Sequence, residues 1–261
     1  MDARLVFLGS LHIVIGAASL TLTVVTTSVI FTNKDLFKWI SYKIMFQLNL
    51  CYLFHITAHI GVLGALLDIG WFGILFFNFL LSLERLNVTI CKTYVKINKV
   101  AFVIISVLAW SPGVIFCGID LSPFTDFYFD YEACIWTLSG PLKSILMNFS
   151  QSLTFTILPL TFFAYLLIYL HLAKKKTAYS DSQSQQERGN VEQCILMPST
   201  LMFSYALAAK AVFFILRRTS FWINFASLIV WMSEPLFCQV VQVVFNSADD
   251  CRVTSFRHLN A

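Results

Sequence analysis

Charged residues are scarce in this chain. Only 12% of its 261 residues are Asp, Glu, Lys or Arg, whereas a soluble domain is about one quarter charged. The chain is 58% hydrophobic and contains 26 Phe, so a water-soluble globule of this composition would expose large apolar patches. The composition therefore excludes an ordinary soluble domain and predicts a protein that crosses a membrane several times. We expect membrane lipid as a partner and no nucleic acid.

The sequence also lacks the motifs of metal sites and hydrolases. None of its seven cysteines forms a CxxC pair or a Cys/His cluster, which argues against a zinc site and a disulfide scaffold. HExxH and GxSxG are absent, so we expect neither an enzyme nor a cofactor. The first apolar stretch is too long for the core of a signal peptide and lacks a small-residue cleavage site. We expect it to remain as the first membrane span.

The chain does contain a series of long apolar segments. A helix needs about 20 mostly apolar residues to cross the hydrocarbon core of a bilayer. The segments that meet this requirement are, approximately, residues 5–31, 44–67, 69–90, 99–119, 144–172, 194–216 and 221–245. We therefore predict an all-α membrane protein that forms a single seven-transmembrane helix bundle.

The boundary between the second and third spans needs a separate argument. Residues 44–90 form one apolar block, which would be about 70 Å long as a continuous helix. The chain must therefore turn back within this block. Asp68 and Gly70 lie near its middle in a glycine-rich stretch, and they predict a tight turn there.

The Lys and Arg residues between the spans predict the orientation, because short cytoplasmic loops are enriched in them. With the N-terminus outside, most of these residues face the cytoplasm, including the lysines at 174–176, and few face outward: Arg4, Lys143, Arg217 and Arg218. The acids lean the other way, and four of them lie in one outer loop: Asp120, Asp126, Asp130 and Glu132. We therefore predict a multi-pass protein of the cell membrane with its N-terminus outside and its C-terminus in the cytoplasm.

The stretch FLLSLERLNVTI, residues 79–90, places an acid beside a base at the predicted cytoplasmic end of the third span. Such a pair often only marks the membrane boundary, with the arginine reaching lipid phosphates. Glu84 and Arg85 also resemble the Glu/Asp-Arg-Tyr motif of rhodopsin-like G-protein-coupled receptors, although Leu86 takes the third position. The resemblance implies a switch in which acids hold the arginine at rest and release it on activation. Glu192, just before span six, is the expected second partner of the arginine.

Further residues resemble the same superfamily. Trp110 and Pro112 in LAWSPG, and Pro159 in span five, are similar to the tryptophan and prolines of those helices, although a proline alone can simply kink a helix. The stretch WISYKIMFQLNL, residues 39–50, together with LSLERLN, resembles the nematode serpentine chemoreceptors, class T or the related class X. This family implies a chemosensory receptor that binds a small extracellular molecule and activates a heterotrimeric G protein.

The sequence departs from the receptor pattern at several positions. Cys134 stands where the second outer loop of the family carries a cysteine, but no cysteine lies between Cys51 and Cys91 to pair with it from span three. Cys134 is therefore either free or paired in another way. Span seven has Glu234-Pro235 in place of Asn-Pro-x-x-Tyr, and the acid in the middle of span two is absent. A truncated or non-signalling relic of a receptor is therefore the alternative interpretation.

Ionisable residues within a span are costly unless they face protein or water, so they point to functional sites. Lys210 lies about 9 Å from the outer end of span six, and Glu234 about 20 Å from that of span seven. We expect both to line a ligand cavity walled by Tyr205, Trp222 and Trp231. The alternatives are a structural ion pair, a lysine that reaches the membrane surface, and ordinary aromatic packing.

Two other features have two interpretations each. His55 and His59 share one helix face at a spacing that can bind a metal, but no third ligand is evident, so polar packing is favoured and no metal is expected. The outer loop SPFTDFYFDYEACIW, residues 122–136, either guides cationic or aromatic ligands or folds as a lid over the bundle.

A transporter is the competing function from another class. Transporters often show internal repeats and charges near the membrane midplane. The sequence has no evident repeat, and its only deep charge is Glu234. A receptor is therefore the favoured function.

Overall fold

The computed structural model describes residues 3–34, 36–61, 64–91, 98–130, 132–178, 200–209, 211–212 and 220–259. The elements are α1 (Ala3–Thr32), the short 3-10 helix η1 (Leu36–Lys38), α2 (Ile40–Gly61), α3 (Gly64–Leu86), the π-helical turn η2 (Asn87–Cys91), α4 (Lys99–Asp120), β1 (Asp126–Asp130), β2 (Ile135–Ser139), α5 (Lys143–Ala178) and α7 (Phe221–Leu259). One more apolar helix, Thr200–Ala209, lies between α5 and α7 in the sequence.

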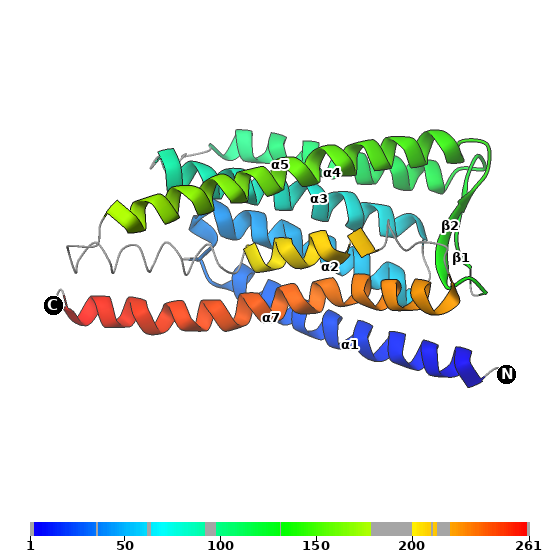
Figure 1. Ribbon diagram of the computed structural model, residues 1–261, viewed down its shortest axis with the longest axis horizontal. Helices are drawn as coiled ribbons and strands as arrows, with labels where there is room; N and C mark the ends of the chain where they lie inside the picture. Colours follow the sequence, from blue (N-terminus) through cyan, green and yellow to red (C-terminus); the bar gives the residue numbers. More distant parts are fainter. Residues whose placement is uncertain are drawn as a thin grey trace.

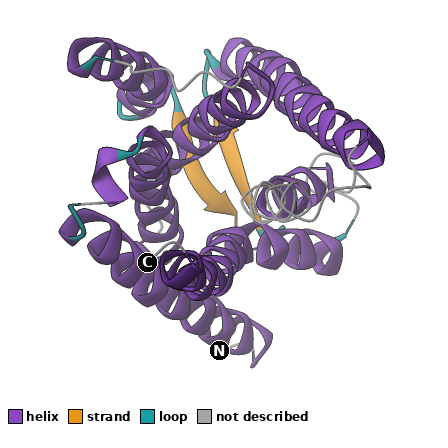
Figure 2. Cartoon of the chain, turned by 90° about the vertical axis from the view of Figure 1, so that its left-hand side faces the viewer, coloured by secondary structure: helices purple, strands orange, loops and turns teal. Residues whose placement is uncertain are grey.

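The helices run along the long axis of the molecule (Figure 1). The N-terminus and the β1–β2 hairpin lie at one end, which we call the hairpin end. The C-terminus and the end of α3 lie at the other, which we call the charged end because it contains Glu84 and Arg85. Seen along this axis, the helices form a ring, and the two strands lie across its middle (Figure 2). The hairpin therefore covers one mouth of the bundle.

The helices have the length and the outward faces of membrane spans. Five described helices are long and apolar enough to cross a bilayer: Gly9–Thr32, Gly64–Ile90, Lys99–Asp120, Lys143–Lys174 and Phe221–Val244. Large apolar side chains such as Val103 and Leu108 of α4 and Phe163 of α5 are exposed, and lipid tails match such surfaces, whereas water does not. Together with α2 and Thr200–Ala209, the described part of the chain contains the seven predicted helices.

The predicted turn at Asp68 and Gly70 is wrong. Both residues lie inside α3, because α2 already ends at Gly61 and α3 begins at Gly64. A Cβ atom on Gly70 would lie 2.7 Å from the backbone nitrogen of His55 on α2, so this glycine allows two helix backbones to approach closely. Gly70 therefore marks tight packing between α2 and α3 and not a change of chain direction.

The hairpin was not part of the predicted all-α fold. Strands β1 and β2 pair antiparallel, from Asp126 opposite Ser139 to Asp130 opposite Ile135. The Asp130 carboxylate accepts hydrogen bonds from the backbone N–H groups of Glu132 and Ala133, both at 3.0 Å, and this side-chain turn closes the hairpin.

Buried polar side chains connect the helices in the middle of the bundle. Thr26 of α1 donates a hydrogen bond to Oε1 of Gln239 on α7. The amide group of Gln239 then donates to Oδ1 of Asn49 on α2 at 2.9 Å. Because lipid offers polar groups no partner, such bonds fix the positions of neighbouring spans.

Candidate functional site

The interior of the hairpin end is built around Trp231 of α7. Its ring centroid lies 5.0 Å from that of His55, 5.1 Å from that of His59 and 5.3 Å from that of Trp71, all with edge-to-face geometry. All four side chains are buried. This packing brings α2, α3 and α7 together, and edge-to-face aromatic pairs add stability beyond the area that they bury.

The hairpin adds a fifth ring to this group. Trp136 of β2 is buried, and its indole Nε1–H donates a hydrogen bond to Nδ1 of His59 at 3.3 Å. Phe127 and Phe129 of β1 pack on the same indole, each with its ring centroid 5.4 Å away. We call the rings of His55, His59, Trp71, Trp136 and Trp231 the hairpin-end cluster. The hairpin therefore folds as a lid that reaches into the bundle.

Glu234 follows Trp231 by three residues on α7 and is only 1% exposed. It lies close enough to the phenols of Tyr52 and Tyr205 to act on both electrostatically. The Tyr205 hydroxyl donates to the carbonyl of Val230 at 3.1 Å and shares a hydrogen bond of 2.6 Å with Ser233. A carboxyl group this deeply buried is costly unless polar groups face it, so its burial marks Glu234 as a candidate functional residue.

The structure thus brings three of the predicted ligand residues, Tyr205, Trp231 and Glu234, to adjoining turns of neighbouring helices. Lys210 lies outside the described residues. Trp222 is 55% exposed on α7, so the prediction that it walls an internal cavity is wrong. The role of the other residues in ligand binding stays a prediction.

His55 and His59 belong to the same cluster, with their ring centroids 4.7 Å apart. Among the described residues, no group of three His, Cys, Asp or Glu side chains is arranged to hold a metal ion. Their contacts with Trp136 and Trp231 match the predicted packing role. No pattern in the sequence indicated that Trp71 and Trp136 pack with these histidines, or that His12 of α1 lies beside His59 with its ring centroid 5.8 Å away. These contacts join elements that are far apart in the chain.

Two acidic side chains lie close to each other near the hairpin. Asp68 on α3 and Asp120 at the end of α4 lie close enough for their carboxyl groups to act on each other electrostatically. Gly113 of α4 lets the two helices meet here, since a Cβ atom on it would lie 2.8 Å from the Cα atom of Ile69.

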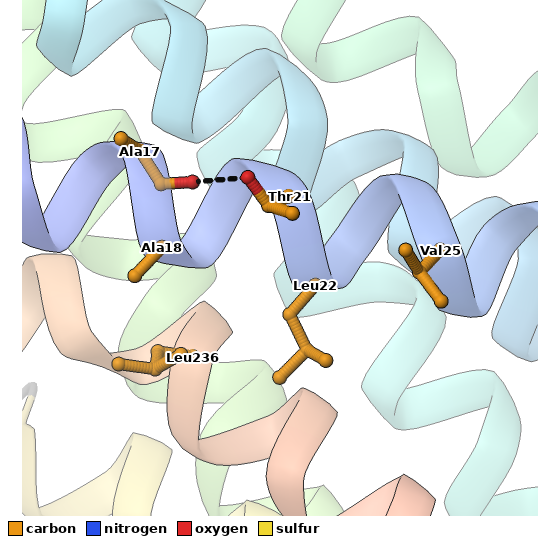
Figure 3. Close-up of a pocket in the computed structure, with 6 residues that line it drawn as sticks. All are labelled: Ala17, Ala18, Thr21, Leu22, Val25 and Leu236. Carbon is orange, nitrogen blue, oxygen red and sulfur yellow. Dashed lines mark hydrogen bonds between the residues drawn. The ribbon is translucent and has the colours of Figure 1, made fainter.

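A groove on the surface of the bundle, shown in Figure 3, is separate from the hairpin-end cluster. It is a shallow, open depression of about 490 Å³ between α1 and α7, lined by Ala17, Ala18, Thr21, Leu22, Val25 and Leu236. Its one hydroxyl group, that of Thr21, already donates to the carbonyl of Ala17 at 2.8 Å. The groove lies on a lipid-facing surface and offers no polar group for a water-soluble ligand.

At the charged end, Glu84 and Arg85 close α3. The Arg85 Nε atom lies 3.6 Å from Oε2 of Glu84, and the two side chains are 18% and 12% exposed, respectively. Ser41, in the first turn of α2, donates a hydrogen bond of 2.7 Å to Oε1 of Glu84. The predicted partner Glu192 lies outside the described residues. An ion pair so little exposed is less screened by solvent than one on a surface.

The backbone changes directly after this pair. Residues Asn87–Cys91 form a π-helical turn, a rare conformation that is common at functional sites. The third helix therefore has an irregular end next to its acid and base. The sequence predicted the pair but not this turn.

Comparisons with known proteins place this geometry in a known fold. No protein-family model matches the sequence, and no curated protein matches it. Among solved structures, the crystal structure of squid rhodopsin matches with a TM-score of 0.76 at 14% identity, over 95% of this chain and 80% of that chain. The chain has the fold of rhodopsin. The prediction of a seven-helix membrane bundle is therefore confirmed, while the narrower resemblance to nematode serpentine receptors stays a prediction.

Proposed function

We propose that this chain is a rhodopsin-like G-protein-coupled receptor that binds a small extracellular molecule and activates a heterotrimeric G protein. The observation that carries the proposal is the Glu84–Arg85 pair, which closes α3 at the end of a rhodopsin fold opposite the hairpin. The resemblance to nematode serpentine receptors, class T or X, adds a chemosensory role to the proposal.

The charge distribution supports an orientation with the hairpin outside. Basic residues follow α1 and begin or end α2, α4 and α5 at the charged end: Lys34, Lys43, Lys99 and Lys174. The hairpin instead carries Asp126, Asp130 and Glu132. Because cytoplasmic loops are enriched in Lys and Arg, the charged end is the cytoplasmic side, and the N-terminus near the hairpin is outside.

The charged end supplies a physical basis for switching. A partly buried arginine costs free energy when it loses its carboxylate, so the paired state is favoured at rest. A G protein that binds the released Arg85 would compensate for that loss, and the balance between the two states would then depend on the ligand. The Ser41 hydrogen bond to Glu84 adds to the stability of the paired state.

The ligand part of the proposal concerns the interior below the hairpin. We assign Tyr205, Trp231 and Glu234, with Lys210 as a fourth residue, to the small-molecule site. The three described residues lie on helix Thr200–Ala209 and on α7, and a ligand between these helices would bias the movement of one against the other. The aromatic ring of Trp231 and the carboxyl of Glu234 favour a ligand with both an apolar face and a polar group.

The experiment is a nucleotide-exchange assay on membranes that contain the chain and members of each class of heterotrimeric G protein. The Glu84→Gln variant weakens the resting pair, so basal exchange should rise about fivefold, the shift that about 1 kcal/mol produces. Arg85→Ala should abolish exchange. Lys99→Ala, an exposed cation at the same end, is the matched control and should behave like the wild type.

Surface expression of each variant is measured in parallel. Exchange that is absent in the wild type and in all three variants, despite full surface expression, would contradict the proposal and favour a non-signalling receptor relic. Uptake of small solutes under the same conditions would instead favour a transporter.

A further inference from the structure

The side chain of His59 connects the hairpin to the helices. It is 3% exposed and lies at the hairpin end of α2. Its Nδ1 atom is the acceptor for the indole N–H of Trp136, at 3.3 Å. The hairpin has a second attachment, where the Asn224 amide of α7 donates to the carbonyl of Ala133 at 2.8 Å.

The donor fixes the protonation state of His59. An indole N–H can only donate, so Nδ1 must carry no hydrogen, and the imidazole is neutral with its hydrogen on Nε2. Among the described residues, this Nε2 atom is buried and has no hydrogen-bond partner. A proton added to Nδ1 would break the bond to Trp136 and place a charge in a buried site.

The titratable groups around His59 do not offset that charge. His12 of α1 donates through Nε2 to the backbone carbonyl of His59 at 3.2 Å, and the two ring centroids are 5.8 Å apart. His55 lies one turn earlier on α2, at 4.7 Å. These two histidines are the groups that act electrostatically on His59, and both become positive on protonation. The acid of the hairpin turn, Asp130, is engaged with backbone N–H groups.

We propose that the Trp136–His59 hydrogen bond is a proton-sensitive latch, which holds the β1–β2 hairpin over the bundle and opens when the solution on that side becomes acidic. The latch needs only that the hairpin end meets water, and it does not depend on coupling to a G protein. In the open state the imidazole is exposed and titrates near pH 6.5, as histidine ordinarily does. Each pH unit below that value therefore favours opening by about tenfold.

Cys134 is a native reporter of the latch. It lies between the two strands, is 6% exposed and forms no disulfide. Burial raises the pKa of its thiol to about 11, so the closed state reacts slowly with a maleimide. The full chain in lipid nanodiscs, which expose both faces to the solution, is alkylated at about pH 7.5 and about pH 5.5. Mass spectrometry of the Cys134 peptide gives the rate at each pH.

The reference variant is His59→Asn. The asparagine oxygen takes roughly the place of Nδ1 and accepts from Trp136, but it does not titrate. The ratio of the wild-type rate to the variant rate therefore cancels the pH dependence of the thiol reaction itself. We expect this ratio to rise by about tenfold between the two pH values. Trp136→Phe keeps an aromatic ring but lacks the N–H donor. Its Cys134 thiol should therefore react faster than that of His59→Asn at both pH values.

A ratio that does not change with pH would overturn the latch. The latch would also be overturned if the relative alkylation rate of Cys134 rose at low pH in the wild type but not in His12→Asn. In that case the proton would act at His12 and not at His59. If His59→Asn does not fold, Trp136→Phe becomes the reference. The latch then requires that the wild-type rate approach the Trp136→Phe rate at the lower pH, and a constant gap would contradict it.

Discussion

The two ends of the bundle are held together in different ways. At the hairpin end, α1, α2, α3, α7 and β2 contribute rings to one group of contacts. At the charged end, Glu84 and Arg85 are neighbours on one helix, and in the described part of the chain a single hydrogen bond from Ser41 joins them to α2. The difference suggests that changes at the hairpin end cost stability, whereas changes at the charged end shift a balance between states.

The largest effect is expected for Trp231→Ala, which removes the central ring of the hairpin-end cluster. Large-to-small changes of this kind cost about 3–5 kcal/mol of unfolding free energy. Trp222→Ala is the matched control, because the same residue type on the same helix is 55% exposed and its loss should cost far less. Thermal unfolding of both variants in detergent measures the difference. Equal losses would show that the cluster does not hold the hairpin end together.

Gly70→Ala should have the next largest effect. Its new methyl group would lie 2.7 Å from the backbone nitrogen of His55, so α2 and α3 must move apart, at a cost of about 1–3 kcal/mol. Gly118→Ala on α4 is the control, because a Cβ atom there meets no atom within 4 Å. Chemical or thermal unfolding distinguishes the two. A Gly70→Ala variant as stable as the control would contradict the close approach of α2 and α3.

Ser41→Ala should have the smallest effect on stability and a measurable one on activity. It removes the hydrogen bond to Glu84, worth about 1 kcal/mol, so basal nucleotide exchange should rise no more than about fivefold. The melting temperature should fall by no more than about 2–4 °C. Ser10→Ala, whose hydroxyl bonds only within its own helix among the described residues, is the control. A large loss of stability without a change in nucleotide exchange would contradict the comparison. It would show that the charged end, like the hairpin end, contributes to stability and not to a balance between states.

Much of the fold could be predicted from the sequence, because the hydrocarbon core sets the length and polarity of a span. The helices and the acid–base pair at the end of α3 follow from this constraint. The turn between α2 and α3 was misplaced because Gly70 serves close packing, which no local pattern distinguishes from a turn. Strands β1 and β2 were missed because they are short, so the alternation of apolar and polar residues along each of them is too brief to indicate a strand.

The site was less predictable than the fold. Trp231 and Glu234 could be singled out because one is aromatic and the other ionisable within a span, and their role in ligand binding stays a prediction. His12, Trp71 and Trp136 were missed, because their importance comes from contacts between elements far apart in the sequence. Such contacts depend on tertiary packing and leave no local pattern in a single sequence.

The most direct test of the account asks which end of the bundle faces the outside of the cell. Tyr128→Cys places a thiol at a position that is 48% exposed on the hairpin, and Lys99→Cys places one at the exposed start of α4. A membrane-impermeant maleimide, with the wild-type signal subtracted, should label Tyr128→Cys in intact cells and Lys99→Cys only after permeabilisation. The reverse pattern would put Arg85 outside the cell and contradict a cytoplasmic switch.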